Sequence, residues 1–116
     1  MCEKQAFNEL TFFSELKKRP GMYLGSPSLL SLRDNLYGMD YAFSFCSEDS
    51  PLRYFRAFID WYHTGVLDDA NGYACWWNHL LYTSGNDDRI AFKRFFDEFE
   101  RFLRDVYNVN LPSEKS

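Results

Sequence analysis

The chain lacks long apolar runs and is poor in cysteine. No stretch approaches the roughly 20 apolar residues that a membrane-spanning helix needs, and the N-terminus has no apolar segment of the signal-peptide type. The three cysteines, Cys2, Cys46 and Cys75, are an odd and scattered set without a neighbour at metal-ligand spacing. This pattern excludes a disulfide framework and favours free thiols in the reducing cytoplasm. We therefore expect a cytoplasmic protein without a membrane partner.

Groups for catalysis are also scarce. The two histidines, His63 and His79, fall on different expected helices. A zinc site would need Asp60 or Cys75 to join them in space, and nothing in the spacing requires this. Cys75 and His79 lie one helical turn apart, but a cysteine nucleophile also needs a third group to orient its base. No phosphate-binding glycine loop or dinucleotide motif occurs. The sequence therefore predicts no catalytic residue, no metal and no cofactor.

The charge balance is acidic, with a formal net charge of −4 and an isoelectric point of about 5.1. An acidic chain without a basic run is a poor nucleic-acid binder, because contacts with phosphates supply most of that affinity. Opposite charge speeds the encounter of two proteins, so the chain is better suited to a basic protein partner.

Aromatic side chains are unusually frequent, at 20% of the chain, with 12 Phe, 8 Tyr and 3 Trp among 116 residues. A chain of this length suits one domain, and so small a domain cannot bury all these rings because its surface is large relative to its volume. We expect a single helical domain over residues 1–116 with some Tyr and Trp side chains at its surface, where they favour recognition. For any one ring, a bulky core with partly exposed edges is the alternative.

Apolar residues recur at spacings of three and four, which is the period of an α-helix, and no stretch shows sustained strand alternation. The first expected helix holds the apolar residues 7–16 and ends at Pro20, with Asn8 or Thr11 as its cap. The other four hold the apolar residues 29–43, 52–62, 73–81 and 92–106. The fold class is therefore an all-α compact bundle of about five helices, followed by a flexible tail over residues 109–116.

The segment 19–25, with the sequence Arg-Pro-Gly-Met-Tyr-Leu-Gly, resembles a segment in the ATPase domains of type II topoisomerases. Those domains continue with a helix that carries a catalytic Glu and a magnesium-binding Asn, and then with a glycine-rich nucleotide loop. Here the next helix carries Asp34, Asn35 and Asp40 in a different pattern, and the nucleotide loop is missing. The resemblance therefore stays local, and ATPase function is rejected.

In physical terms this segment is a helix exit and a tight turn. We expect Gly21 and Gly25 to adopt positive φ angles and residues 22–24 to pack beneath the bundle. We also expect Gly38 to let another helix approach closely, and Gly85 to end the fourth helix.

A broader pattern covers most of the chain. It combines the segment 19–25 with Ser31-Leu32, Gly38–Tyr41, Phe58–Trp61, the aromatic residues 72–81 and a C-terminal helix over 95–103. In size, acidity and general look the chain resembles the immunity proteins of contact-dependent and other polymorphic toxin systems. Such bacterial proteins lack catalytic residues and bind one toxin domain in the cytoplasm of the producing cell. The resemblance implies a protein that neutralises a cognate toxin domain and is not an enzyme.

The candidate contacts with such a toxin are three acidic pairs, Glu48-Asp49, Asp68-Asp69 and Asp87-Asp88. Trp76, with Trp77 or Trp61, would anchor the contact if it is exposed. Each candidate has an alternative explanation, because acidic residues cap helices and solvate loops while tryptophans fill cores.

Two other functions stay open. The aromatic excess also fits an adaptor or regulatory protein, or a homodimer interface. A small enzyme would use Cys75 and His79 with an acid, although a helix residue beside a buried thiol explains that pair without catalysis.

Overall fold

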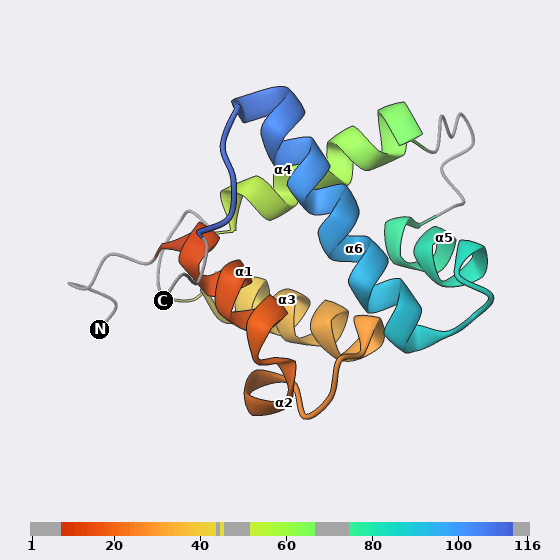
Figure 1. Cartoon of the computed structure of the whole chain (residues 1–116). Helices are drawn as coiled ribbons and strands as arrows, with labels where there is room; N and C mark the ends of the chain where they lie inside the picture. Colours follow the sequence, from red (N-terminus) through yellow and green to blue (C-terminus); the bar gives the residue numbers. More distant parts are fainter. Residues whose placement is uncertain (1–7, 44, 46–51, 67–74, 113–116) are drawn as a thin grey trace.

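The computed structural model describes residues 8–43, 45, 52–66 and 75–112, which form helices and no strand within those ranges. Six α-helices follow in order: α1 (Glu9–Lys18), α2 (Pro20–Tyr23), α3 (Leu29–Phe43), α4 (Arg53–Trp61), α5 (Trp76–Thr83) and α6 (Asp88–Phe102). Two π-helical turns, η1 (Tyr62–Val66) and η2 (Leu103–Tyr107), continue α4 and α6 (Figure 1). The all-α prediction is confirmed. The five expected helices correspond to α1, α3, α4, α5 and α6.

Helix α6 crosses the middle of the bundle, with α1 and α3 on one side, α5 on the other and α4 behind it (Figure 1). Its inward stripe is formed by phenylalanines that are at most 1% exposed, namely Phe95, Phe96, Phe99 and Phe102. Phe13 of α1 packs on Phe99 with ring centroids 4.6 Å apart. Phe58 of α4 meets three of these rings edge to face. Burial of each ring contributes about 1.5–3 kcal/mol, so this aromatic core supplies much of the stability.

The N-terminus of α4 is held by a residue of α1. The N-cap residue of α4 is Leu52, whose apolar side chain cannot accept a hydrogen bond. Instead the two carboxylate oxygens of Glu9 accept the backbone N–H groups of Tyr54 and Phe55 at 2.9 and 2.8 Å. Glu9 is only 7% exposed, and this burial raises the pKa of its carboxyl group although the N–H donors lower it. A single side chain therefore satisfies two donors that the helix leaves unpaired.

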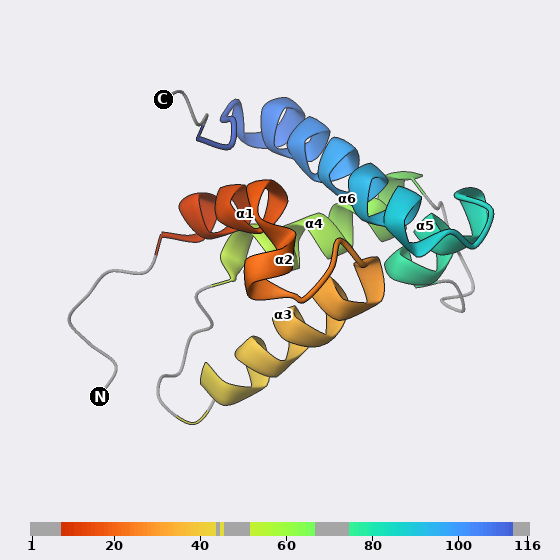
Figure 2. The same cartoon turned by 60° about the horizontal axis from the view of Figure 1, so that its bottom comes forward.

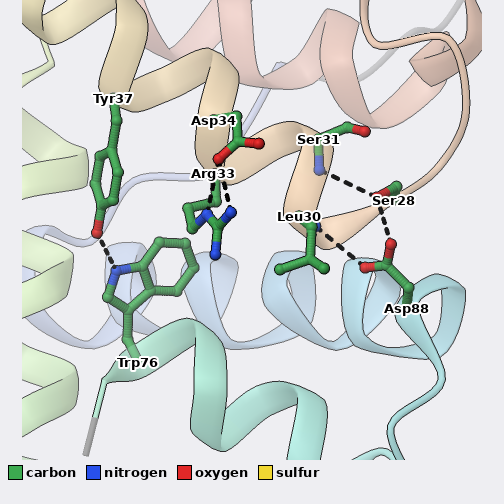
Figure 3. A network of polar contacts seen from close by, with 8 residues as sticks. All are labelled: Ser28, Leu30, Ser31, Arg33, Asp34, Tyr37, Trp76 and Asp88. Carbon is green, nitrogen blue, oxygen red and sulfur yellow. Dashed lines mark hydrogen bonds and ion pairs between the residues drawn. The ribbon is translucent and has the colours of Figure 1, made fainter.

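Two further helices begin in the same way. At the start of α3, Asp88 of α6 accepts the Leu30 N–H at 3.1 Å and the hydroxyl of Ser28, while the Ser28 oxygen accepts the Ser31 N–H (Figure 3). At the start of α5, Nε2 of His63 accepts the Trp76 N–H at 3.2 Å. Three of the helices are thus capped by side chains from other helices, and each cap fixes where two elements meet.

The cap of α1 and the end of α5 are local features that agree with the sequence. Asn8 accepts the Thr11 N–H at 3.0 Å, so Asn8 is the cap of α1. Gly85 has a φ of +70° directly after α5, as expected for a residue that ends a helix. Both features involve residues that are close together along the chain, and for that reason the sequence could predict them.

The segment after α1 differs from expectation. Gly25 has the expected positive φ of +86°, but Gly21 does not, because Pro20 begins the extra helical turn α2 and Gly21 lies inside it. This turn points Met22 and Tyr23 outward, at 70% and 45% exposure, so the prediction that they pack beneath the bundle is wrong. Leu24 alone packs against the core.

Gly38 also differs from expectation. Apart from its chain neighbours and the backbone of its own helix, nothing lies within 4 Å of the position that a Cβ would take there, so no second helix approaches it. Figure 2 explains this, because the C-terminal half of α3 extends away from the rest of the bundle. Within the described ranges, no helix combines the length and the apolar character that crossing a membrane requires.

Part of the expected flexible tail is held against the bundle. Asn108 ends η2 in the left-handed region with a φ of 58°. Val109 and Leu111 then pack against the core, and the Ser14 hydroxyl donates to the Pro112 carbonyl at 2.8 Å. The tail is therefore packed as far as Pro112, because its apolar residues cover the open side of α1. Residues 113–116 lie outside the described ranges.

We predict that Glu9→Ala lowers the free energy of unfolding by about 2–4 kcal/mol, because two backbone N–H groups lose their acceptor. Glu9→Gln keeps one acceptor oxygen and should lose only about 1 kcal/mol. Urea denaturation followed by circular dichroism measures both values. Glu15→Gln on the same helix is the control and should change stability by less than about 0.5 kcal/mol. Equal losses for Glu9→Ala and Glu15→Gln would show that α4 forms without this cap.

Candidate functional site

Four of the acidic residues predicted to contact a partner lie outside the described ranges, namely Glu48, Asp49, Asp68 and Asp69. The third acidic pair, Asp87-Asp88, lies within the described ranges. Asp87 caps α6, where its Oδ1 accepts the N–H groups of Arg89 and Ile90 at 3.0 and 3.1 Å. Asp87 stays exposed, so it can still meet a partner while it caps the helix.

Asp88 cannot serve in the same way. Its two oxygens face α3, where they bind Ser28 and the Leu30 N–H, and the residue is partly buried (Figure 3). The prediction that Asp88 belongs to a contact surface is therefore replaced by a structural role as the cap of α3. The alternative explanation, in which acidic residues cap helices, accounts for both members of this pair.

Trp76 does not meet the condition of exposure under which it would act as an anchor. It is 2% exposed, and its ring packs edge to face on Phe55 at 5.5 Å. Its indole N–H donates to the Tyr37 hydroxyl at 3.0 Å (Figure 3). Trp76 is a core residue, because its ring fills the space between α4 and α6 while its N–H finds a partner at the edge.

The other two tryptophans are partly exposed and lie beneath arginines. The guanidinium carbon of Arg33 is 4.4 Å from the Trp77 ring centroid, and that of Arg101 is 5.2 Å from Trp61. Both are cation–π contacts, worth about 0.5–1 kcal/mol at exposed sites. These arginines cover part of each ring, so neither tryptophan is an open anchor.

Three exposed aromatic side chains follow one another along α3 and just beyond its end. Tyr37 and Tyr41 are one helical turn apart on α3, and Phe45 follows four residues later, just beyond the end of the helix. Their exposures are 44%, 69% and 75%, and the rings of Tyr41 and Phe45 meet edge to face at 5.2 Å. We call these three residues the α3 aromatic stripe. The buried side of α3 is formed by Leu29, Leu32 and Leu36.

The inner end of the stripe contacts the core, and its outer end is exposed. Tyr37 is held by the hydrogen bond from Trp76, and its ring also contacts Phe55. Tyr41 follows this anchor one turn later on α3, and Phe45 lies just beyond the end of the helix. The C-terminal half of α3 extends from the rest of the bundle (Figure 2). The stripe was not among the residues predicted from the sequence, although Tyr37, Tyr41 and Phe45 recur every four residues there, opposite the leucines of α3.

Both histidines hold α5 against η1. His63 caps α5 at Trp76, and the Tyr62 hydroxyl is hydrogen-bonded to Nδ1 of His79 at 2.8 Å. The imidazole that Cys75 would need as a base is therefore engaged with Tyr62. Within the described residues, no three His, Cys, Asp or Glu side chains lie close enough together to hold a metal ion.

The Tyr62–His79 pair favours its neutral form. Burial raises the pKa of Tyr62 to about 12, with the Glu98 carboxylate adding to the effect. Burial also lowers the pKa of His79 below its usual 6.5, and the nearby Arg94 charge lowers it further. A phenol that keeps its proton and a neutral imidazole can share this hydrogen bond in either direction, depending on the imidazole tautomer, so the bond persists over the physiological pH range.

This pair predicts a pH dependence of stability. The folded protein binds a proton at His79 less readily than the unfolded chain does, so stability falls as the pH drops below about 6.5 towards the lower folded pKa. His79→Gln, which keeps an acceptor but does not titrate, should show a shallower fall. Urea titrations between about pH 8 and pH 5 measure the difference between the two proteins. Identical slopes would contradict the role given to His79.

The described residues thus gather exposed aromatic rings on α3 and use both histidines to position α5. Comparisons with protein-family models, curated proteins and solved structures find no match for this chain.

Proposed function

We propose that this chain is a non-catalytic cytoplasmic binding protein that neutralises a cognate bacterial toxin domain. The observation that carries the proposal is the α3 aromatic stripe. Tyrosine and phenylalanine rings supply a large contact area at low cost in side-chain entropy, and aromatic residues are enriched in the centres of protein interfaces. Tyr41 and Phe45 are 69% and 75% exposed, and the C-terminal half of α3, which carries Tyr41, extends from the bundle (Figure 2).

The charge of the chain supports a basic partner. The net charge is −4, and the chain continues from Phe45 directly towards Glu48 and Asp49. A toxin domain that acts on nucleic acid needs a basic surface for phosphate contacts. An acidic protein that covers such a surface would block the substrate, and opposite charge would speed its association. Asp87 is a further exposed acidic residue that this surface could include.

The placement of the reactive side chains supports a protein without catalysis. Each histidine is committed to a structural hydrogen bond with a neighbouring element. Cys75 is the N-cap residue of α5, and the ring one turn away is bonded to Tyr62. A nucleophile and its base need to be free to reach one another and a substrate. Here the imidazole of His79 is hydrogen-bonded to Tyr62 instead.

We predict that the double variant Tyr41→Ser/Phe45→Ser loses protection against the toxin. Truncation of central aromatic contacts costs at least about 2 kcal/mol, which weakens binding by about thirtyfold or more. The measurement co-expresses each variant with the product of the adjacent upstream gene and records growth and co-purification. Tyr82→Ser is the matched control, because Tyr82 is 76% exposed but lies on α5. Full protection by the double variant, or no protection by the unchanged protein, would overturn the proposal.

Self-association through the same rings is the competing function. We predict that sedimentation velocity gives a monomer over a wide range of concentrations, because three rings bury less area than a stable homodimer requires. A dimer that forms with rising concentration and is abolished by Tyr41→Ser/Phe45→Ser would instead assign the stripe to a homodimer interface.

A further inference from the structure

A hollow of about 460 Å³ opens between the first half of α6 and the segment that leaves α1. Its apolar lining consists of Phe92 and Phe96 from α6 and of Pro20 and Pro27 from the opposite side. The two rings are 6% and 1% exposed, so they belong to the packed core and form a firm base. The volume falls in the range of small-molecule sites, which is roughly 300–1,000 Å³.

The rim of this hollow is basic although the chain is acidic. Lys17, Arg89 and Lys93 line it, against the single carboxylate of Asp97. The Lys17 ammonium is already paired with Glu100, just outside the hollow. The positive charge that remains for a ligand is therefore that of Arg89 and Lys93, which are both exposed.

Arg89 and Lys93 are one helical turn apart on α6, where like charges repel. Among the residues that the structure describes, no carboxylate forms an ion pair with either of them. An anion between the two side chains would replace this repulsion with two charge-assisted hydrogen bonds. The apolar part of the same molecule would cover the Phe92 ring and the prolines.

The wall opposite α6 is held in place by the fold. Gly25, with a φ of +86°, turns the chain after α2, and Asp88 at the start of α6 binds Ser28 and the Leu30 N–H beyond it (Figure 3). Pro27 lies between these two points. The segment 19–25 and the residues that follow it thus form a preformed side of the hollow, which lowers the entropic cost of binding.

We propose that this hollow binds a small aromatic anion, an aryl carboxylate or sulfonate, with its acidic group between Arg89 and Lys93 and its ring against Phe92. The charge of the rim selects the acidic group, and the apolar lining selects the ring. The hollow shares no residue with the α3 aromatic stripe, and the proposal does not depend on toxin neutralisation.

The test uses two fluorescent probes with the same aromatic body, anilinonaphthalene sulfonate and its neutral counterpart phenylnaphthylamine, titrated into the full chain. Arg89→Gln/Lys93→Gln should weaken binding of the sulfonate roughly tenfold and leave that of the neutral probe unchanged. Added salt should likewise weaken only the sulfonate, because the two cations are exposed. Amide chemical shifts should move in the segments 19–28 and 89–97.

Two control variants locate the effect. Arg101→Gln/Arg104→Gln removes the same charge beyond the hollow, and Tyr41→Ser/Phe45→Ser removes the exposed rings of α3; both should bind the sulfonate as the unchanged protein does. All substituted residues are exposed, and circular dichroism confirms that each variant is folded. Equal sulfonate binding by Arg89→Gln/Lys93→Gln and the unchanged protein would overturn the proposal. Loss of binding in Tyr41→Ser/Phe45→Ser would also overturn it, because the probe would then occupy the stripe.

Discussion

The hydrogen bonds from Glu9 to the start of α4 are the contact on which the arrangement of the bundle depends. They join the first helix of the described chain to a helix far along the sequence, and they place a nearly buried carboxylate against two backbone donors. The desolvation of that carboxylate is the cost, and the two satisfied N–H groups offset it. Asp88 at α3 and His63 at α5 repeat the same solution. The start of each of these helices is therefore held against another helix.

This dependence complements the aromatic core. Phenylalanine rings pack favourably in several tilted and edge-to-face geometries, as the contacts of Phe58 and Phe95 show. Such a core supplies stability but specifies register only loosely, because apolar contact is not directional. A carboxylate that meets the free N–H groups of a helix end is directional and has one correct position. The cross-helix caps thus select one arrangement among those that the aromatic residues would allow.

The sequence predicted what depends on neighbours along the chain. Helical periodicity located the five long helices, and local patterns gave Asn8 as one of two cap candidates for α1 and Gly85 as the end of α5. The sequence could not show that Asp88 faces α3. Its partner Ser28 is 60 residues away along the chain and becomes a neighbour only in the folded protein. The burial of Trp76 was left open by the sequence, and Met22 was misplaced, for a related reason. Hydrophobicity alone does not say which apolar side chain faces inward, and the extra turn at Pro20 turned Met22 outward.

The hydrogen bond between Tyr37 and Trp76 has one more consequence. It connects the exposed α3 aromatic stripe to an indole that is almost completely buried. The emission of an indole depends on the polarity and hydrogen bonding around its N–H, and here that partner is the first residue of the stripe. A molecule that settles on α3 and displaces the Tyr37 hydroxyl would therefore change the emission of Trp76 from inside the core. Binding at the stripe would then be measurable through tryptophan emission without an attached label, on a background from Trp61 and Trp77.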